Sequence, residues 1–511
     1  MTQFPERFNM AEYFLDRNLA AGRGDKVCLR FGDERWTYAE AVMHSNRAGG
    51  LLRELGAGVE DRVLFALPDC PQFVAGWFGA AKIGSVIAMV NPLLPAEDYA
   101  YYLDYTRAKV FVVYESLVES LRPILARAKY LKNVLVVGDE SHGFPHYEDL
   151  ALQMPDGLET ADTHRDDPAI WLFTSGSTGK PKAAVHLQHD LPYNTECYAK
   201  QILRMREDDV TVAVPKLFFG YATGTNLLFP FAVGGETALF AERSTPEKLF
   251  EVIERYRPTV LTNVPTMINA MLNTPGAGER DLSSLRVCVS AGEALPPELY
   301  RRWKETFGVE ILDGVGSAEM FHIYISNCFG DVREGCLGKI VPGYEAEIIG
   351  PDGWPLPDGQ MGTLRIKGDS AAICYWQAHE KSKETFAGDY CTTGDQFTRD
   401  AEGYFWYGGR TDEMLKVSGV FVSPTEVENC LLEHEAVCEC AVVGFQDEDG
   451  LTKTSAYVTL NEGFAQSAEL ARQLQEFVKG RLAMHKYPRR VIFKDGLPKN
   501  DRGKIDRKSL K

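Results

Sequence analysis

The sequence lacks any long uninterrupted run of apolar residues. No stretch of its 511 residues approaches the roughly 20 apolar residues that a membrane-spanning helix needs, so no membrane span is expected. The segment from Met1 to Arg7 contains no apolar core of the kind that signal peptides carry, so we expect no secretory leader. These two absences predict a protein that has no membrane partner.

The sequence also lacks an excess of basic residues and an ordered cysteine pattern. Its formal net charge of -17 at pH 7 argues against nucleic acid or an anionic membrane surface as the main partner. An anionic ligand would therefore need basic groups gathered locally. The 11 cysteines follow no regular spacing, which is typical of free thiols in a reducing cytosol. We therefore expect a cytoplasmic protein.

One group of cysteines is open to a second interpretation as a zinc site, namely Cys430, His434, Cys438 and Cys440. Residues 427–434 have the pattern of a helix, and residues 440–444 have that of a strand. The gap between Cys438 and Cys440 is shorter than the spacing usual between zinc ligands. Packed thiols are therefore the favoured interpretation, with zinc as the alternative.

The order of apolar patterns predicts more than one domain of α/β type. A chain of 511 residues, 45% of them hydrophobic, is long enough for about three domains of ordinary size. Strand patterns alternate with helical ones, which favours parallel sheets with helices on their faces. The strand patterns cover residues 61–67, 85–90, 110–114, 210–214 and 287–290, and the helical ones 39–56, 73–83 and 246–257.

The pattern of helix and strand signals changes in the last third of the chain. Past Gly335 the sequence has short strand patterns and turns, as in residues 344–349 and 363–366. After the segment 408–412 the final hundred or so residues have the pattern of a compact α+β module. We therefore expect a domain boundary near Asp412.

A glycine-rich segment from Thr174 to Lys182 follows an apolar run over residues 169–173 that has the pattern of a buried strand. Its glycines, hydroxyl side chains and two lysines suit a polyphosphate, because backbone N–H groups and ammonium groups both bind anions. It is not a Walker loop, because only Ser177 and Thr178 separate its glycines. Pro181 also disfavours a helix that starts at Lys180. The alternative is a flexible Gly/Ser surface loop.

Other motifs accompany this segment in a fixed order. They are Gly314–Glu319, Thr392–Asp395, Gly403–Arg410 and Pro498–Lys504. In order and spacing the chain resembles the adenylate-forming superfamily of acyl-CoA synthetases, adenylation domains and luciferases over nearly its whole length. Three segments look like its benzoate–CoA ligase branch, namely Lys216–Tyr221, Glu319–Ile323 and Asp412–Pro424.

The resemblance implies a fold of two parts. Residues 1–411 would form a large N-terminal domain of helix-flanked sheets plus a distorted β-barrel, which is an α/β architecture. Residues 412–511 would form a small, mobile C-terminal α+β domain that acts as a lid and carries the catalytic lysine. Asp412 would be the hinge, although without the resemblance an ordinary solvated turn aspartate is the favoured interpretation.

The resemblance also implies an activity with ATP, Mg²⁺ and coenzyme A. A small aromatic carboxylic acid would attack the α-phosphate of ATP to give an acyl-adenylate and pyrophosphate, and coenzyme A would then take the acyl group and release AMP. Attack on ATP crowds negative charge, so preorganised cations and N–H donors would supply much of the catalysis. The assembly state is left open, with a homodimer as one option.

Residues for ATP follow from the same resemblance. Glu319 would help to bind Mg²⁺, and Asp395 would accept hydrogen bonds from the ribose hydroxyls with the help of Arg410. The phosphate-binding residues would be Thr174, Ser175, Gly176, Ser177, Thr178, Gly179, Lys180 and Lys182. The adenine-lining residues would be Gly292, Glu293, Asp313, Gly314 and Val315.

Residues for the acid and for coenzyme A are implied in the same way. The acid would lie among Gly220, Tyr221, Ala291, Gly316, His322 and Ile323. His322 is open to two interpretations, a contact of the acid's carboxylate or a packed core histidine. Lys416 would face the site in the second step, and Gly419 would line the passage of the thiol.

Several positions depart from the family pattern. Ala318 stands where most relatives have threonine, Val315 replaces an aromatic residue and Ala183 replaces a glycine. Gly220 and Thr223 are smaller or more polar than expected, so space beside the ring of the acid would admit a substituent.

Two alternative functions remain. One is a stand-alone adenylating enzyme that loads a separate carrier protein. The other, which Ala318 favours, is a nucleotide-binding sensor without turnover.

Lys504 is the residue that we expect to act as the catalytic cation, with a solvated lysine in a basic tail as the alternative. Bridging the acid's carboxylate and the α-phosphate would neutralise both groups as they approach. Lys504→Ala should therefore lose about 2.7–4 kcal/mol of transition-state stabilisation in adenylation. It should still convert a supplied acyl-adenylate to thioester. Rates of the two half-reactions, measured separately, check this, and an equal loss in both would contradict it.

Overall fold

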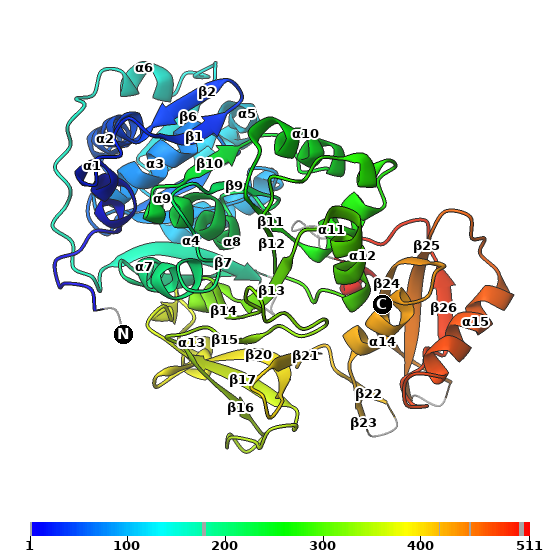
Figure 1. Ribbon diagram of the computed structural model, residues 1–511. Helices are drawn as coiled ribbons and strands as arrows, with labels where there is room; N and C mark the ends of the chain where they lie inside the picture. The colour runs from blue at the N-terminus through cyan, green and yellow to red at the C-terminus, as the bar shows by residue number, and fades with distance from the viewer. Residues whose placement is uncertain (1–2, 176–179, 418–419, 449–450, 500–504, 511) are drawn as a thin grey trace.

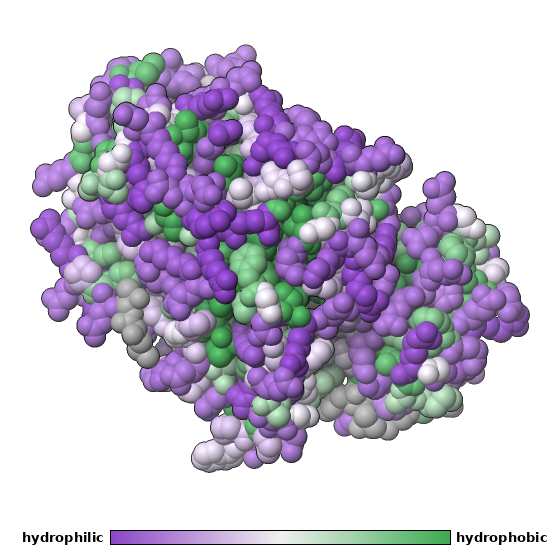
Figure 2. Space-filling view, in the orientation of Figure 1, coloured by the Kyte–Doolittle hydropathy of each residue, from purple (hydrophilic) through white to green (hydrophobic). Residues whose placement is uncertain are grey.

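A computed structural model describes residues 3–175, 180–417, 420–448, 451–499 and 505–510 of the chain. It consists of a large body that holds the N-terminal and central parts of the chain and a smaller body formed by the C-terminal part (Figure 1). Within those residues, every helix is too short or too polar to cross a membrane. The visible face is covered mostly by hydrophilic residues (Figure 2).

The first sheet is mostly parallel and contains the strand that leads into the glycine-rich segment. Its strand order is β18-β8-β7-β4-β3-β5-β6. The strands from β7 through β4, β3 and β5 to β6 pair in parallel, whereas β7–β8 and β8–β18 are antiparallel. The bounds are β3 Arg62–Ala66, β4 Val86–Met89, β5 Val110–Tyr114, β6 Asn133–Val137, β7 Pro168–Ser175, β8 Pro181–Leu187 and β18 Cys374–Tyr375.

The second sheet repeats this architecture. Its strand order is β15-β14-β13-β12-β11-β9-β10-β1-β2, with parallel pairing from β13 to β1 and antiparallel pairing at both ends. The bounds are β1 Val27–Phe31, β2 Glu34–Thr37, β9 Val210–Ala213, β10 Glu236–Leu239, β11 Val260–Asn263, β12 Val287–Ser290, β13 Ile311–Gly316, β14 Ile323–Ser326 and β15 Lys339–Ile340. Strands β10, β11 and β12 are buried along their whole length, as expected when helices cover both faces.

Helices connect these strands, and most begin at a sequence signal that favours a helix start. Thr37 caps the first long helix and makes a reciprocal capping box with Glu40, while proline opens several others. The α-helices are α1 Arg17–Ala20, α2 Tyr38–Glu54, α3 Pro71–Lys82, α4 Ala96–Thr106, α5 Glu115–Leu125, α6 Tyr147–Ala151, α7 Asp190–Asn194, α8 Gly220–Thr223, α9 Phe229–Val233, α10 Pro246–Tyr256, α11 Pro265–Leu272, α12 Pro297–Phe307 and α13 His379–Thr385. Short π- and 3₁₀-helices are η1 Glu12–Asp16, η2 Thr195–Ala199, η3 Gly224–Leu228, η4 Ala277–Glu279 and η5 Ala318–Met320.

The predicted distorted β-barrel is built around an antiparallel sheet. It runs β16-β17-β20-β19, with β21 also paired to β20, and it lies below the second sheet in Figure 1. The bounds are β16 Glu345–Ile349, β17 Gly362–Lys367, β19 Phe386–Ala387, β20 Tyr390–Arg399 and β21 Phe405–Arg410. The short strand patterns past Gly335 therefore correspond to strands that pair antiparallel, whereas most earlier strands pair parallel.

The C-terminal part forms the smaller body. A three-stranded sheet β24-β25-β26 is covered by two helices, and a short hairpin β22–β23 precedes it. The bounds are β22 Leu415–Val417, β23 Val420–Val422, α14 Pro424–Leu432, β24 Val437–Gln446, β25 Thr452–Leu460, α15 Ala468–Lys479, β26 Arg490–Phe493 and η6 Arg507–Leu510. The large body ends with β21 at Arg410 and the next strand begins at Leu415; the boundary before Asp412 stays a prediction.

Candidate active site

The glycine-rich segment lies between two strands of a hairpin. Thr174 pairs with Lys182 and Ser175 with Pro181 at the ends of β7 and β8. Strand β8 begins at Pro181, so a strand rather than a helix follows the segment. The side chain of Ser175 and all of Gly176, Ser177, Thr178 and Gly179 lie outside the described residues, and their phosphate role stays a prediction.

Lys182 and Glu319 meet at one tyrosine. The Tyr375 hydroxyl donates a hydrogen bond of 2.6 Å to Glu319 Oε1, and Lys182 Nζ lies 4.2 Å from the centroid of the same ring. Burial lowers the pKa of Lys182, while the negative charge of Glu319 acts in the opposite direction. The structure thus brings a predicted phosphate-binding lysine and the predicted acidic residue together.

Lys180 directly precedes β8 and lies near helix α4. Its Nζ is 5.3 Å from the centroid of the Tyr101 ring, and the Tyr101 hydroxyl donates a hydrogen bond of 2.6 Å to the Pro181 carbonyl. Helix α4 therefore supports the second end of the glycine-rich segment. Neither Tyr101 nor Tyr375 belongs to a motif, so the sequence alone does not indicate that they contact the lysines beside the glycine-rich segment.

The residues expected around the acid cluster at Tyr221 and His322. His322 Nε2 is 3.1 Å from the Tyr221 carbonyl, and the two ring centroids are 5.4 Å apart. The Tyr221 hydroxyl lies 3.3 Å from the carbonyls of Asn263 and Val289, at the ends of β11 and β12. Two glycines give the histidine room, since a Cβ at Gly224 would lie 2.7 Å from its ring and one at Gly316 would lie 2.4 Å from its carbonyl.

His322 is deeply buried. It is 3% exposed and its ring packs against those of Tyr198 and Phe229. Burial lowers the pKa of His322 to about 4, against a weak opposing effect of its bond to the Tyr221 carbonyl, so the ring is neutral at pH 7. Among the described residues Nδ1 has no hydrogen-bond partner. The buried packing of the ring is thus a fact, and its contact with the acid stays a prediction.

The other residues predicted for the acid line the ends of the second sheet. Ala291 is 4% exposed and directly follows β12, while Ile323 begins β14 and is 1% exposed. Gly220 begins α8, and a Cβ there would lie 3.0 Å from Cδ1 of Leu172 on β7. The residues predicted for the acid therefore come from α8, from the residue after β12, and from the β13–β14 connection with the strand ends beside it.

The predicted adenine residues gather at the carboxyl ends of β12 and β13. Ser290 and Asp313 are register partners, and Gly314, Val315 and Gly316 continue β13. Burial raises the pKa of Asp313 to about 8. Gly292 has a φ of 91°, which suits a residue without Cβ. The open crevice beyond the carboxyl ends of parallel strands is a common place for a nucleotide.

Glu293 faces a helix start. Its Oε2 accepts hydrogen bonds from the backbone N–H of Thr266, at 3.3 Å, and from the Thr266 hydroxyl, at 2.8 Å. These contacts place the carboxylate at the first turn of α11, where it satisfies a donor and matches the helix dipole. A contact of Glu293 with adenine stays a prediction.

The ribose residues face each other across two strands. Asp395 on β20 and Arg410 on β21 are register partners, with Arg410 Nη1 3.3 Å from Asp395 Oδ1. Arg410 Nε also lies 3.4 Å from Asp412 Oδ1. Burial lowers the pKa of Arg410, but the negative charges of Asp395 and Asp412 outweigh this effect. The pKa of Arg410 is therefore raised above its usual value. One arginine therefore links the predicted ribose acid to the predicted hinge.

The remaining predicted residues lie near the smaller body. Asp412 is exposed in a turn, and Lys416 is exposed on β22. Gly419 and Lys504 lie outside the described residues. The alternative zinc group finds no support, since no cluster of metal-ligating side chains occurs among residues that the structure describes. Cys440 instead donates a hydrogen bond of 3.4 Å to the Glu428 carbonyl.

Two charged residues, Asp69 and Lys216, hold the segment before the predicted acid residues. Asp69, in the connection between β3 and α3, accepts a hydrogen bond of 2.8 Å from Leu217 N–H, and Lys216 Nζ donates one of 2.7 Å to the Phe240 carbonyl. Burial raises the pKa of Asp69 to about 6 and lowers that of Lys216 to about 8, and the attraction between them opposes both shifts. The segment before Gly220 is therefore held from two sides.

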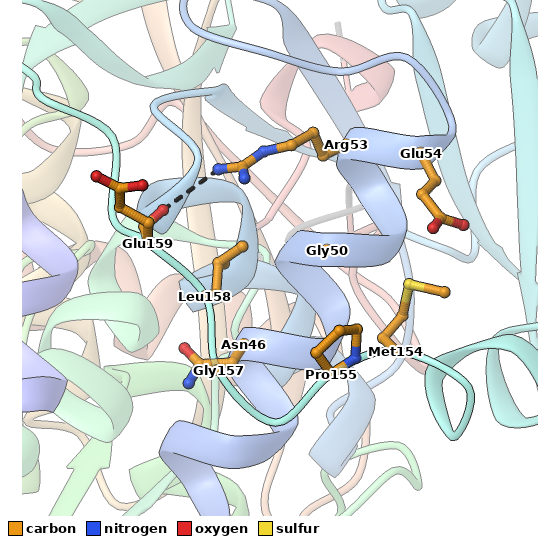
Figure 3. Close-up of a pocket in the computed structure, with 9 residues that line it drawn as sticks. All are labelled: Asn46, Gly50, Arg53, Glu54, Met154, Pro155, Gly157, Leu158 and Glu159. Carbon is orange, nitrogen blue, oxygen red and sulfur yellow. Dashed lines mark hydrogen bonds between the residues drawn. The ribbon is translucent and has the colours of Figure 1, made fainter.

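A surface hollow of about 390 Å³ lies elsewhere, between α2 and residues 154–159. Figure 3 shows its lining, in which Arg53 contacts the backbone of Glu159 over 3.3 Å. It contains none of the residues predicted for catalysis or binding. The candidate site is therefore defined by side-chain chemistry and not by the size of a hollow.

Comparisons with known proteins match the chain over nearly its whole length. Residues 16–376 match the AMP-binding enzyme family, and residues 426–504 match the AMP-binding enzyme C-terminal domain. The chain is 43% identical to the benzoate–CoA ligase of Thauera aromatica, over 100% of this chain and 97% of that protein.

Two solved structures are also similar. One is an anthranilate CoA ligase in complex with anthranoyl-AMP, with a TM-score of 0.95 and 37% identity over 99% of this chain and 97% of that one. The other is a benzoate CoA ligase from Burkholderia xenovorans LB400, with a TM-score of 0.92 and 40% identity over 98% of this chain and 99% of that one.

The neutral state of His322 predicts a pH dependence of stability. Its pKa is lowered to about 4 in the folded protein from 6.5, so the unfolded chain binds the extra proton first as the pH falls. The stability that the neutral ring contributes is complete above pH 6.5, declines below it and is lost through pH 4. Between pH 6.5 and 5 the free energy of unfolding should fall by about 2 kcal/mol on this account. His322→Asn should therefore lose less stability than the wild type over that interval.

Denaturant unfolding at the two pH values measures this difference. His379→Asn is the matched control, because the His379 side chain is 75% exposed and should leave the pH slope as in the wild type. Equal slopes in wild type and His322→Asn would contradict a buried neutral ring.

Proposed function

We propose that the chain, which belongs to the AMP-binding enzyme family, is an ATP-dependent ligase that joins a benzoate-type acid to coenzyme A. It forms an aryl-adenylate with release of pyrophosphate and then transfers the acyl group to coenzyme A with release of AMP. The observation that carries this proposal is the position of one connection, β13–β14. It holds Glu319 beside Lys182 and Tyr375 and holds His322 beside Tyr221.

The residues on the two sides of that connection suit the two reactants. A lysine, a carboxylate and the hairpin of the glycine-rich segment are groups that nucleotide phosphates and their counterion bind. Aromatic rings, small residues and a neutral histidine suit a flat apolar ring with a single charged end. The Asp395–Arg410 pair supplies an acceptor for a vicinal diol.

Glu319 fits a Mg²⁺ ion that is held mainly by nucleotide phosphates. Such an ion takes one or two carboxylates from the protein, and among the residues described here Glu319 is the acid beside Lys182. When bound, the ion would neutralise phosphate charge. Tyr375 orients the carboxylate by its 2.6 Å hydrogen bond, and Lys182 adds positive charge at the same place.

The first step needs cations and a positioned acid. The acid's carboxylate oxygen attacks the α-phosphorus, the bond to the bridging oxygen breaks, and pyrophosphate leaves. Lys504 is proposed to span the carboxylate and the α-phosphate, and Lys180 and Lys182 are proposed to hold the leaving phosphates. Preorganised charge of this kind lowers the barrier because it requires no rearrangement at the moment of reaction.

The second step needs a different arrangement of the smaller body. The thiol of coenzyme A attacks the acyl carbon, and AMP leaves with the bonding electrons. Residues 412–511 are proposed to turn about Asp412, which Arg410 contacts over 3.4 Å. A turn at that position would change the surroundings of Arg410 and of the ribose together.

One panel of acids and acceptors tests the function. Benzoate, 2-aminobenzoate, 4-hydroxybenzoate and acetate are each supplied with ATP, Mg²⁺ and either coenzyme A or a phosphopantetheinylated carrier protein. Release of AMP should require an aromatic acid and coenzyme A together, with acetate slower by roughly 100-fold or more. Faster release with the carrier protein would favour carrier loading. Absence of acid-dependent pyrophosphate exchange would favour the nucleotide sensor.

The space beside Gly220 is filled by a neighbouring strand. Cδ1 and Cδ2 of Leu172 lie 3.0 and 3.3 Å from the place that a Cβ on Gly220 would take. The Thr223 hydroxyl is also engaged, since it donates a hydrogen bond of 2.6 Å to the Leu217 carbonyl. We therefore propose that Leu172, rather than Gly220 alone, limits which ring substituents the site accepts.

Leu172→Ala should raise the preference for substituted rings over benzoate by about tenfold, because it removes a side chain that fills this space. Gly220→Ala should act in the opposite direction, since its methyl group would press on Leu172. The effect of Gly220→Ala should be much smaller in the Leu172→Ala background, because its methyl group then has no leucine side chain to press on. The ratios of kcat/KM for benzoate and for the substituted acids measure this, and additive effects would contradict the contact.

A further inference from the structure

A buried histidine–aspartate pair contacts the active-site connection from outside it. His186 on β8 and Asp190 at the start of α7 have side chains that are 0% and 1% exposed. His186 Nδ1 lies 2.8 Å from Asp190 Oδ2, and Nε2 lies 2.6 Å from the Ala318 carbonyl oxygen. The family motifs noted in the sequence do not include either residue.

The direction of the bond to Ala318 follows from chemistry. A backbone carbonyl only accepts hydrogen bonds, so His186 Nε2 must carry a hydrogen and donate it. Asp190 fixes the ring through Nδ1, and its Oδ2 also accepts from Leu187 N–H over 3.1 Å. A carboxylate that orients an imidazole in this way sets where its other nitrogen points.

The connection that receives this bond is strained. Phe321 has φ 69° and ψ -56°, and His322 N–H donates to the Met320 carbonyl over 2.9 Å, which is the i to i+2 bond of a γ-turn with positive φ. A non-glycine residue holds such a conformation only where its surroundings impose it, at a cost on the order of 1–3 kcal/mol. Strain of this kind gathers at functional sites.

The surroundings fix the connection through its carbonyl groups. The Ala318 carbonyl is held by His186, and the Glu319 carbonyl accepts from Ala372 N–H over 2.8 Å. The Met320 carbonyl also accepts from the Ser370 hydroxyl over 2.9 Å. Of these donors, His186 comes from β8, the strand that carries Lys182 at its start. This bond therefore ties the phosphate hairpin directly to the residue before Glu319.

The side chain of Ala318 cannot form a hydrogen bond that would hold the connection. Alanine offers no hydroxyl, so at this position the rest of the protein can hold only the backbone N–H and carbonyl groups, and His186 holds the carbonyl. The bond from His186 is therefore the direct restraint on the residue before Glu319. A small rotation there would move the Glu319 carboxylate away from Tyr375 and Lys182.

We propose that His186, oriented by Asp190, is a positioning residue for adenylation that sets Glu319 toward the nucleotide phosphates by holding the Ala318 carbonyl. This rests on the proposed function. It predicts that loss of the Nε2–H donor harms the step that uses ATP and spares the step in which coenzyme A takes the acyl group from a preformed adenylate. A pair that only stabilised β8 and α7 would harm both steps or neither.

Three variants separate these outcomes. His186→Phe keeps a ring of similar size without a donor, and His186→Gln keeps an N–H near the position of Nε2. His189→Phe is the matched control, because His189 also lies near Asp190, over 3.4 Å, but its Nδ1 faces the Arg165 carbonyl and not the Ala318 carbonyl. All three are assayed for acid-dependent pyrophosphate exchange, for thioester formation from a supplied aryl-adenylate, and for thermal unfolding.

We expect His186→Phe to lower the exchange by about 10–100-fold, as loss of an orienting partner does. His186→Gln and His189→Phe should stay within about threefold of the wild type in the exchange, since about 0.6 kcal/mol is within the scatter of neutral changes. All three should form thioester from the adenylate at the wild-type rate. If His186→Phe does not fold, His186→Asn replaces it, because its shorter side chain does not reach the carbonyl.

Two results would overturn the inference. One is unchanged exchange in the donor-free variant, and the other is an equal loss in the two half-reactions. A wild-type protein without any acid-dependent exchange would instead overturn the proposed function, and the inference with it. The wild-type measurement thus separates the two failures.

Discussion

The connection between β13 and β14 is the constraint on which the site depends. It carries Glu319, predicted for the phosphates, and His322, predicted for the acid, within four positions, with Phe321 in a strained turn between them. The strain is tolerated because donors from β8 and from residues 370–372 hold successive carbonyls. Reactants that must meet within bonding distance need such a short, rigid link.

Two sheets and a returning strand meet at this connection. The first sheet contributes the β7–β8 hairpin, and the second contributes the carboxyl ends of β11, β12 and β13. Strand β18 then pairs with β8, although nearly two hundred residues separate them in the chain, and so brings Tyr375 over Lys182. The buried Asp69 makes a comparable link, since it reaches from the connection between β3 and α3 to the segment before Gly220. The residues of the candidate site are therefore shared between the sheets, and ligand sites of α/β proteins commonly lie where elements meet in this way.

Much of the fold was predictable because its signals are local. The strand pattern over residues 110–114 is β5, and the helical pattern over residues 246–257 is α10, which ends at Tyr256. The distorted barrel, which is built around the antiparallel sheet, was predictable from the family resemblance and not from local patterns. Tyr375, His186 and Asp69 were not predictable, since each acts through a partner distant in sequence and none has a motif around it.

By itself the sequence determined the order of strands and helices, the family and the chemical types present at the site. Those properties depend on periodicity, on glycine and proline at turns, and on motifs whose residues are close together in the chain. Only the tertiary structure decided which residues hold that chemistry in place. Leu172 fills the space beside Gly220, and His186 holds the Ala318 carbonyl, because β7 and β8 pack against α8 and the β13–β14 connection. Contacts of this kind are set by packing between distant segments, which local sequence does not encode.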